Sequence, residues 1–97
     1  MSDAKNSDTP TWTFLTNHTH VLVCLERDFT MTVRELAIQI GITERSIQRI
    51  LSELESGGVI ERFKEGRKNT YKIIKSHRLH HPLEGDTSVG ELLKAVS

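Results

Sequence analysis

Apolar residues follow a helical spacing near the start of the chain. From about Thr16 to Arg27 they form a stripe that predicts a first helix. The continuous apolar run from Val21 to Leu25 is also typical of a buried strand, so both interpretations stay open at this point. The stripe consists of Leu15, Val21, Leu22 and Leu25.

A second helix has sharper limits. Thr32 and Glu35 have the spacing of a capping box, in which each side chain bonds the other residue's backbone amide. Met31 and Leu36 occupy the two positions of a hydrophobic staple. Gly41 predicts the end of the helix, because glycine tolerates a left-handed conformation. The buried face is predicted to contain Val33, Leu36, Ala37 and Ile40.

A third helix follows after a very short connection. Thr43 is the predicted cap, two residues after Gly41, and Gly57-Gly58 marks the end. Two amphipathic helices joined by so tight a turn cross at a steep angle, which is the helix-turn-helix arrangement. The apolar face of this helix is predicted to contain Ile47, Ile50, Leu51 and Leu54.

Beyond Gly58 the pattern changes from helical to extended. Two segments rich in Val, Ile, Phe and Tyr, residues 59–64 and 70–75, predict strands. Residues 65–69 between them carry charge and predict the turn of a β-hairpin. A short extended stretch is also expected at residues 29–31. A hairpin directly after a helix-turn-helix is the wing of a winged helix.

The last segment predicts one more short helix. Ser88 and Glu91 form another capping box, and a short apolar stripe follows. So short a helix is marginal alone in water, so its apolar face must pack on something. It either folds back on its own domain or joins Trp12 and Phe14 in a dimer contact. The residues predicted for that contact are Leu92, Leu93 and Val96.

These elements predict an α+β, mostly α fold with a three-helix core, a β-hairpin wing and a short C-terminal helix. The 97 residues fit one domain. Residues 1–10 are expected to be a flexible tail, residues 11–75 the winged helix-turn-helix domain, and residues 76–97 a linker with the last helix. The tail lacks an apolar signal core, so we expect a cytoplasmic protein with no membrane contact.

Charge is segregated along the chain although the formal net charge is zero. Residues 43–81 contain nine basic and five acidic residues, a net charge of +4, and the rest of the chain carries −4. A local basic excess of this kind is typical of a nucleic-acid-binding segment. A solvated charged face gives the same count, so charge alone does not decide between them.

Several short motifs between residues 34 and 60 together resemble a known family. They are Arg34-Glu35-Leu36-Ala37, Gly41-Ile42-Thr43, Ser46-Ile47 and the run from Leu54 to Ile60. They resemble winged helix-turn-helix transcriptional regulators of the MarR, ArsR and GntR type, over about residues 15–75. The chain departs from these families because it lacks the long flanking helices of MarR proteins and the effector domain of GntR proteins. The resemblance implies a DNA-binding regulator.

In such a fold the second helix of the motif enters the major groove of double-stranded DNA. Arginine, glutamine and serine are residue types that read base edges there, and basic residues of a wing contact the backbone. We therefore expect a DNA-binding homodimer, most simply a repressor. The predicted DNA contacts are Thr43, Arg45, Ser46, Gln48, Arg49, Ser52, Arg67 and Lys68.

Other classes of function fit less well. Histidines and Cys24 occur in two loose groups, residues 18–24 and 77–81, but neither has the ligand spacing of a structural zinc site, so no metal or other cofactor is expected. There is no phosphate-binding loop or nucleophile elbow, so we expect no enzyme. A small-molecule effector has no readable pocket and would have to use the crevice between subunits. The main alternative is a winged helix that binds another protein and not DNA.

Overall fold

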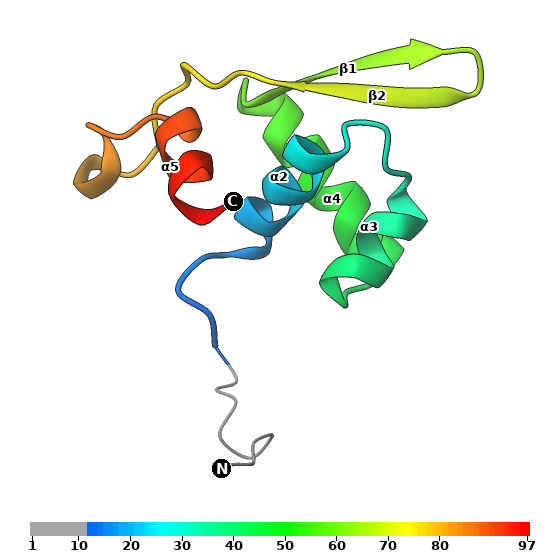
Figure 1. Cartoon of the computed structure of the whole chain (residues 1–97), viewed down its shortest axis with the longest axis horizontal. Coiled ribbons are helices and arrows are strands. Elements are labelled where there is room, and N and C mark those ends of the chain that lie inside the picture. Colours follow the sequence, from blue (N-terminus) through cyan, green and yellow to red (C-terminus); the bar gives the residue numbers. More distant parts are fainter. Residues whose placement is uncertain (1–11) are drawn as a thin grey trace.

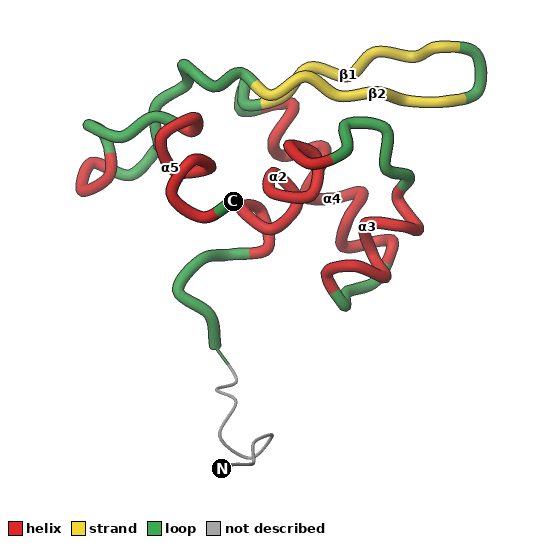
Figure 2. Tube along the Cα trace, viewed as in Figure 1, coloured by secondary structure: helices red, strands yellow, loops and turns green. Residues whose placement is uncertain are grey.

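The computed structural model describes residues 12–97, and the tail expected at residues 1–10 lies outside them. Three helices form a bundle, a two-stranded hairpin extends from one end of it, and a last helix lies beside α2 on the other flank (Figures 1 and 2). The elements in order are α2 (Asn17–Arg27), α3 (Val33–Ile40), α4 (Glu44–Ser56), β1 (Ile60–Glu65), β2 (Lys68–Ile73), the 3-10 turn η1 (Pro82–Glu84) and α5 (Val89–Val96).

The first apolar stripe forms a helix and not a strand. In α2 the buried residues include Val21, Leu22 and Leu25, which share one helical face, while Val23 between them is only half-buried. The helix contacts α3, α4, α5 and β2, and this accounts for the continuous apolar run from Val21 to Leu25. The helix begins at Asn17, with Thr16 at its N-cap.

The local signals of the helix-turn-helix are confirmed. The backbone N–H of Thr32 donates to the Glu35 carboxylate at 2.8 Å, and the N–H of Glu35 donates to the Thr32 hydroxyl oxygen at 3.1 Å. Gly41 has a φ of +86° and ends α3 in the left-handed conformation. Thr43 then accepts from the N–H of Ser46 at 3.0 Å and caps α4, which is separated from α3 by three residues.

The wing is present, with a tighter turn than the five residues predicted. Glu65 pairs with Lys68, so the turn consists only of Gly66 and Arg67. Gly66 has a φ of +64°, and a two-residue hairpin turn requires such a backbone. The strands are therefore displaced by one or two residues from their predicted positions. The extended stretch predicted at residues 29–31 is not a strand, although its Phe29 carbonyl accepts from the N–H of Tyr71 at 3.3 Å.

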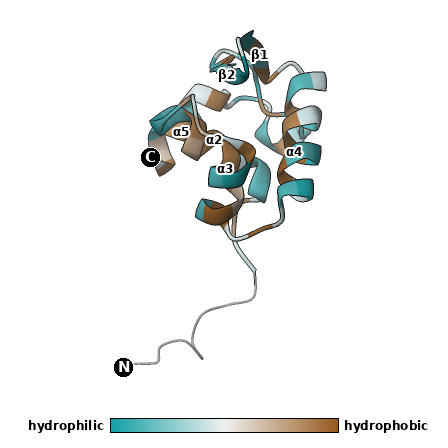
Figure 3. Ribbon diagram, turned by 90° about the vertical axis from the view of Figure 1, so that its right-hand side faces the viewer, coloured by the Kyte–Doolittle hydropathy of each residue, from teal (hydrophilic) through white to brown (hydrophobic). Residues whose placement is uncertain are grey.

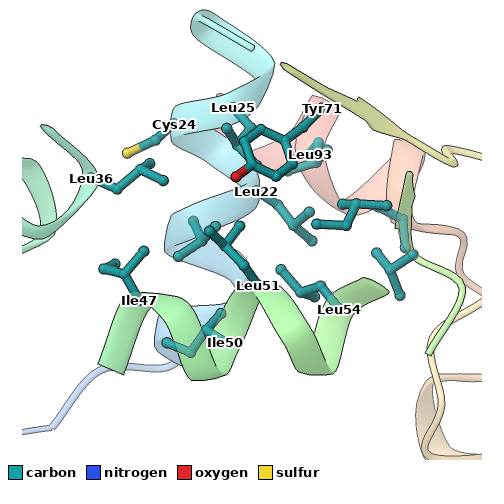
Figure 4. Close-up of a cluster of buried hydrophobic side chains, with 14 of the residues drawn as sticks. Leu22, Cys24, Leu25, Leu36, Ile47, Ile50, Leu51, Leu54, Tyr71 and Leu93 are labelled. Carbon is teal, nitrogen blue, oxygen red and sulfur yellow. The ribbon is translucent and has the colours of Figure 1, made fainter. Parts of the chain in front are cut away.

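One hydrophobic core joins all these elements. The apolar side of α4 faces α2 and α3, and its polar side faces outward (Figure 3). Leu22, Leu36, Leu51, Tyr71 and Leu93, which come from five different elements, meet in this core (Figure 4). The last helix therefore packs on its own chain and contributes to the same core as the helix-turn-helix.

Candidate nucleic-acid interface

The two faces of α4 separate apolar from polar residues as predicted. Its buried residues are Ile47, Ile50, Leu51 and Leu54. The side chains of Arg45, Gln48, Arg49 and Ser52 are exposed, and Ser46 is half-buried. The structure thus brings the predicted base-reading residues together on one outward face.

The N-terminus of α4 is held by a short hydrogen-bonded cap. The Thr43 oxygen accepts from the backbone of Ser46, and the Thr43 hydroxyl donates to the Ser46 hydroxyl oxygen at 2.9 Å. Thr43, Arg45, Ser46 and Arg49 line a shallow hollow at this end of the helix. Free backbone N–H groups and the positive end of the helix dipole favour an anion here. The hollow thus combines two guanidinium groups with a helix terminus that attracts phosphate.

Charge is divided along α4. Toward its C-terminus, Glu53 pairs with His18 at 2.7 Å and Glu55 pairs with Arg62 at 3.3 Å. Within residues 12–97, no carboxylate lies within ion-pair distance of Arg45 or Arg49. The acidic residues near the end of the helix are therefore partly compensated, and the basic residues near its start stay available to a ligand.

The two basic residues of the wing differ in their surroundings. Lys68 lies directly opposite Glu65 across the hairpin, and opposite charges in such a pair attract. Arg67 lies in the exposed turn next to Gly66. Lys68 therefore has a carboxylate on the paired strand opposite it, while Arg67 is exposed in the turn.

Arg62 has a role that the sequence did not indicate. Its guanidinium bonds Glu55 of α4 and lies 5.8 Å from the centre of the Tyr71 ring of β2. Tyr71 is buried, and burial raises the pKa of its phenol. Arg62 thus ties the base of the wing to the end of α4. The sequence lacks a signal for this contact, because the partners lie on opposite sides of the Gly57-Gly58 turn.

The histidines and the cysteine take part in ordinary contacts. His20 bonds the Asn17 side chain at 2.9 Å, and the rings of His77 and His80 stack edge to face at 5.0 Å. Cys24 is buried, which raises the pKa of its thiol. Over the described range, 12–97, no group of three or more histidine, cysteine, aspartate or glutamate residues is arranged to hold a metal ion.

The last helix is positioned differently from the predicted dimer contact. Leu93 is 1 % exposed and its side chain is covered by its own chain, which removes it from that contact. Leu92 is half-buried and Val96 is 39 % exposed, so these two still offer surface to a partner. Trp12 and Phe14 stack on each other and are 59 % and 92 % exposed.

None of the helices in residues 12–97 is long and apolar enough to cross a membrane.

Comparison with known proteins agrees with this architecture. The chain is 38 % identical over 65 residues to the LexA repressor of Thermotoga neapolitana, which covers 67 % of this chain and 32 % of that protein. It is 40 % identical over 48 residues to a riboflavin kinase of Thermococcus kodakarensis, which covers 50 % of this chain and 23 % of that protein. The chain thus spans about a third or less of the length of these relatives. No solved structure matches significantly.

The match to a family model covers most of the described domain. Residues 13–81 fit the model described as a Crp-like helix-turn-helix domain, from the segment before α2 to the residue before η1. The narrower resemblance to MarR, ArsR and GntR regulators stays a prediction. This match agrees with the helix-turn-helix, wing and core of the structure, and the chain belongs to the Crp-like helix-turn-helix domain family.

Proposed function

We propose that this protein is a transcriptional regulator that binds double-stranded DNA in a sequence-specific manner, with α4 in the major groove and the wing on the backbone. The observation that carries the proposal is the outward face of α4, where Arg45, Gln48 and Arg49 are exposed and the two arginines have no acidic partner within residues 12–97. The match to the helix-turn-helix family and the similarity to a LexA repressor support it.

Each residue has a chemical role in this proposal. Arg45 and Arg49 donate to guanine or to phosphate, Gln48 pairs with adenine, and Ser46 and Ser52 bond to either kind of base. Thr43 and the first amides of α4 hold a phosphate. At the wing, Arg67 and Lys68 contact the backbone, which positions the protein without reading sequence.

The proposal includes a homodimer. A single small domain reads few base pairs, and a two-fold dimer reads two half-sites about 34–36 Å apart. The exposed Trp12, Phe14 and Val96 and the half-buried Leu92 provide apolar surface for such a contact. Sedimentation velocity tests this part. A dimer that becomes a monomer in Phe14→Ser supports it, and a wild-type monomer at every concentration contradicts it.

We further propose a cytoplasmic repressor without catalytic activity. A helix-turn-helix that occludes a promoter needs only to bind, and the similarity to a LexA repressor favours this direction of regulation. The part shared with the riboflavin kinase is only 23 % of that protein.

Fluorescence anisotropy with single variants tests the roles of α4 and the wing. Arg49→Ala should reduce the preference for the specific duplex by about tenfold, because a bidentate arginine–guanine contact contributes about 1–3 kcal/mol of discrimination. Arg67→Ala should weaken binding to all sequences and reduce the salt dependence by about one ion per site. Lys68→Ala should have a smaller effect, since Glu65 opposes that charge.

Lys94→Ala on α5 is the matched control, because it removes one exposed cation from a helix outside the helix-turn-helix. It should bind DNA as the wild type does. Equal losses in Arg49→Ala, Arg67→Ala and Lys94→Ala would show only a general charge effect and would contradict the assigned interface.

A further inference from the structure

A second candidate site lies on the side of the domain away from the wing tip. A cavity of about 330 Å³ opens between α2, the C-terminal half of α4 and the segment of residues 78–92 that leads into α5. Figure 1 shows these three parts of the chain on the same flank. Sites for small molecules have volumes of about 300–1,000 Å³, so this cavity suits a small ligand.

Six of the thirteen residues that line the cavity are aliphatic. They come from α2, α4, the residue before β1 and the segment of residues 78–92, and four of the six are also members of the buried core. Such a surface favours an apolar ligand body, because burial of apolar area is the main driving force for binding. The six residues are Leu22, Leu54, Val59, Leu79, Val89 and Leu92.

The rim carries charge of both signs. Arg78 donates one N–H to the Gly85 carbonyl at 3.1 Å and lies near enough to Glu91 to help lower the pKa of that carboxyl. Neither Arg78 nor Glu84 forms an ion pair within residues 12–97, whereas Glu53 on the same rim is paired with His18. The rim therefore presents one cation and one anion whose charge is not neutralised by direct contact.

A buried hydroxyl on the wall also lacks a partner. Thr19 is 8 % exposed and lines the cavity, and its hydroxyl makes no hydrogen bond to another residue in the range 12–97. A threonine in a helix can donate to the carbonyl four residues earlier, but for Thr19 that residue is Leu15, which lies before the start of α2. A buried polar group without a partner is costly, and a ligand would supply one.

We propose that this cavity binds a small zwitterion with an apolar body, namely an α-amino acid with an aliphatic or aromatic side chain. Its carboxylate pairs with Arg78, its ammonium group pairs with Glu84, and its side chain occupies the aliphatic interior. Leu54 and Glu53 in the wall belong to α4, so the ligand contacts the far end of the helix that carries the DNA-reading residues. The site lies within one chain and does not need the crevice between subunits.

Titration of the ¹⁵N-labelled full chain with L-leucine and L-phenylalanine tests the proposal without DNA. We expect saturable amide shifts confined to α2, the end of α4 and residues 78–92. Isopentylamine and 4-methylpentanoate each lack one of the two charges of L-leucine. Each should bind at least about tenfold more weakly than L-leucine, because it loses a charge-assisted hydrogen bond. Glycine, which lacks the apolar body, should not bind.

Two variants and a control locate the site. Arg78→Met and Glu84→Gln should each weaken binding about tenfold. Arg27→Met, which removes an exposed guanidinium elsewhere on α2, should leave it unchanged. The proposal is overturned if no amino acid gives saturable shifts, if the singly charged analogues bind equally well, or if Glu84→Gln binds like the wild type. Because no DNA is present, these outcomes leave the proposed DNA binding untouched.

Discussion

The packing of α5 on α2 makes a sharp prediction about stability. Leu93 is 1 % exposed and Val96, three residues later on the same short helix, is 39 % exposed. Leu93→Ala should therefore destabilise the domain strongly, whereas Val96→Ala should destabilise it little. The two variants remove side-chain carbon from the same helix, so they form a matched pair in which only burial differs greatly.

The expected magnitudes follow from burial. Truncation of a fully buried leucine costs about 2–5 kcal/mol, which includes the cavity left behind. Val96→Ala removes two carbons that are only partly covered, and at about 0.8 kcal/mol per fully buried methylene the cost is below about 1 kcal/mol. A domain of this size has a total free energy of unfolding of about 5–15 kcal/mol, so the loss expected for Leu93→Ala is a large share of it.

Urea unfolding followed by circular dichroism measures both values at one protein concentration. The midpoint of Leu93→Ala should fall well below that of the wild type, and the midpoint of Val96→Ala should change little. A loss below about 1 kcal/mol for Leu93→Ala would refute the packing of α5 on its own chain. Repeating the measurement at a higher protein concentration separates a dimer contact of Val96 from packing within the chain.

Three further predictions concern single backbone and capping positions. Gly41→Ala should cost about 1–2 kcal/mol in urea unfolding, because φ is +86° there and no atom crowds the new methyl group, so the cost is conformational alone. Thr43→Ala should cost about 0.5–2 kcal/mol through the lost cap of α4, and Thr43→Ser should keep most of it. The amide of Ser88 donates to the Glu91 carboxylate at 2.8 Å and holds the pKa of that carboxyl below its ordinary value of 4.5. The stability that this hydrogen bond contributes is therefore present above about pH 4.5 and is lost as the pH falls through the lower pKa of the folded state. Glu91→Gln should flatten the acid limb of a plot of melting temperature against pH.

Local signals in the sequence predicted most of the helix-turn-helix. The caps of α3, α4 and α5 and the left-handed Gly41 depend on residues close together in the chain, and the structure confirms them. The outward face of α4 also followed from the helical period, since four buried residues fix which side faces the core. Periodicity was weaker for α2, where a continuous apolar run left strand and helix both open.

These local signals did not predict the contacts between segments that are distant in the sequence. The position of α5 depends on its contacts with α2, which no local pattern describes. The sequence therefore assigned Leu93 to a partner chain, whereas it packs on its own chain. Two other features also arise only when distant segments meet. They are the ion pair between Arg62 and Glu55 and the cavity that residues 78–92 help to line. The turn of the wing was predicted too long, because charge at residues 65–69 resembled a loop while the strand pairing continues to Glu65 and Lys68.

The central claim is that this protein recognises a DNA sequence through α4. The most direct test is fluorescence anisotropy of the wild-type protein with the DNA upstream of its own gene against a random duplex, across a salt series. The account predicts a preference for the upstream DNA and an affinity that falls steeply with salt, because basic side chains displace counterions from phosphates. No binding to any duplex at low salt would contradict it and would favour a winged helix that binds another protein.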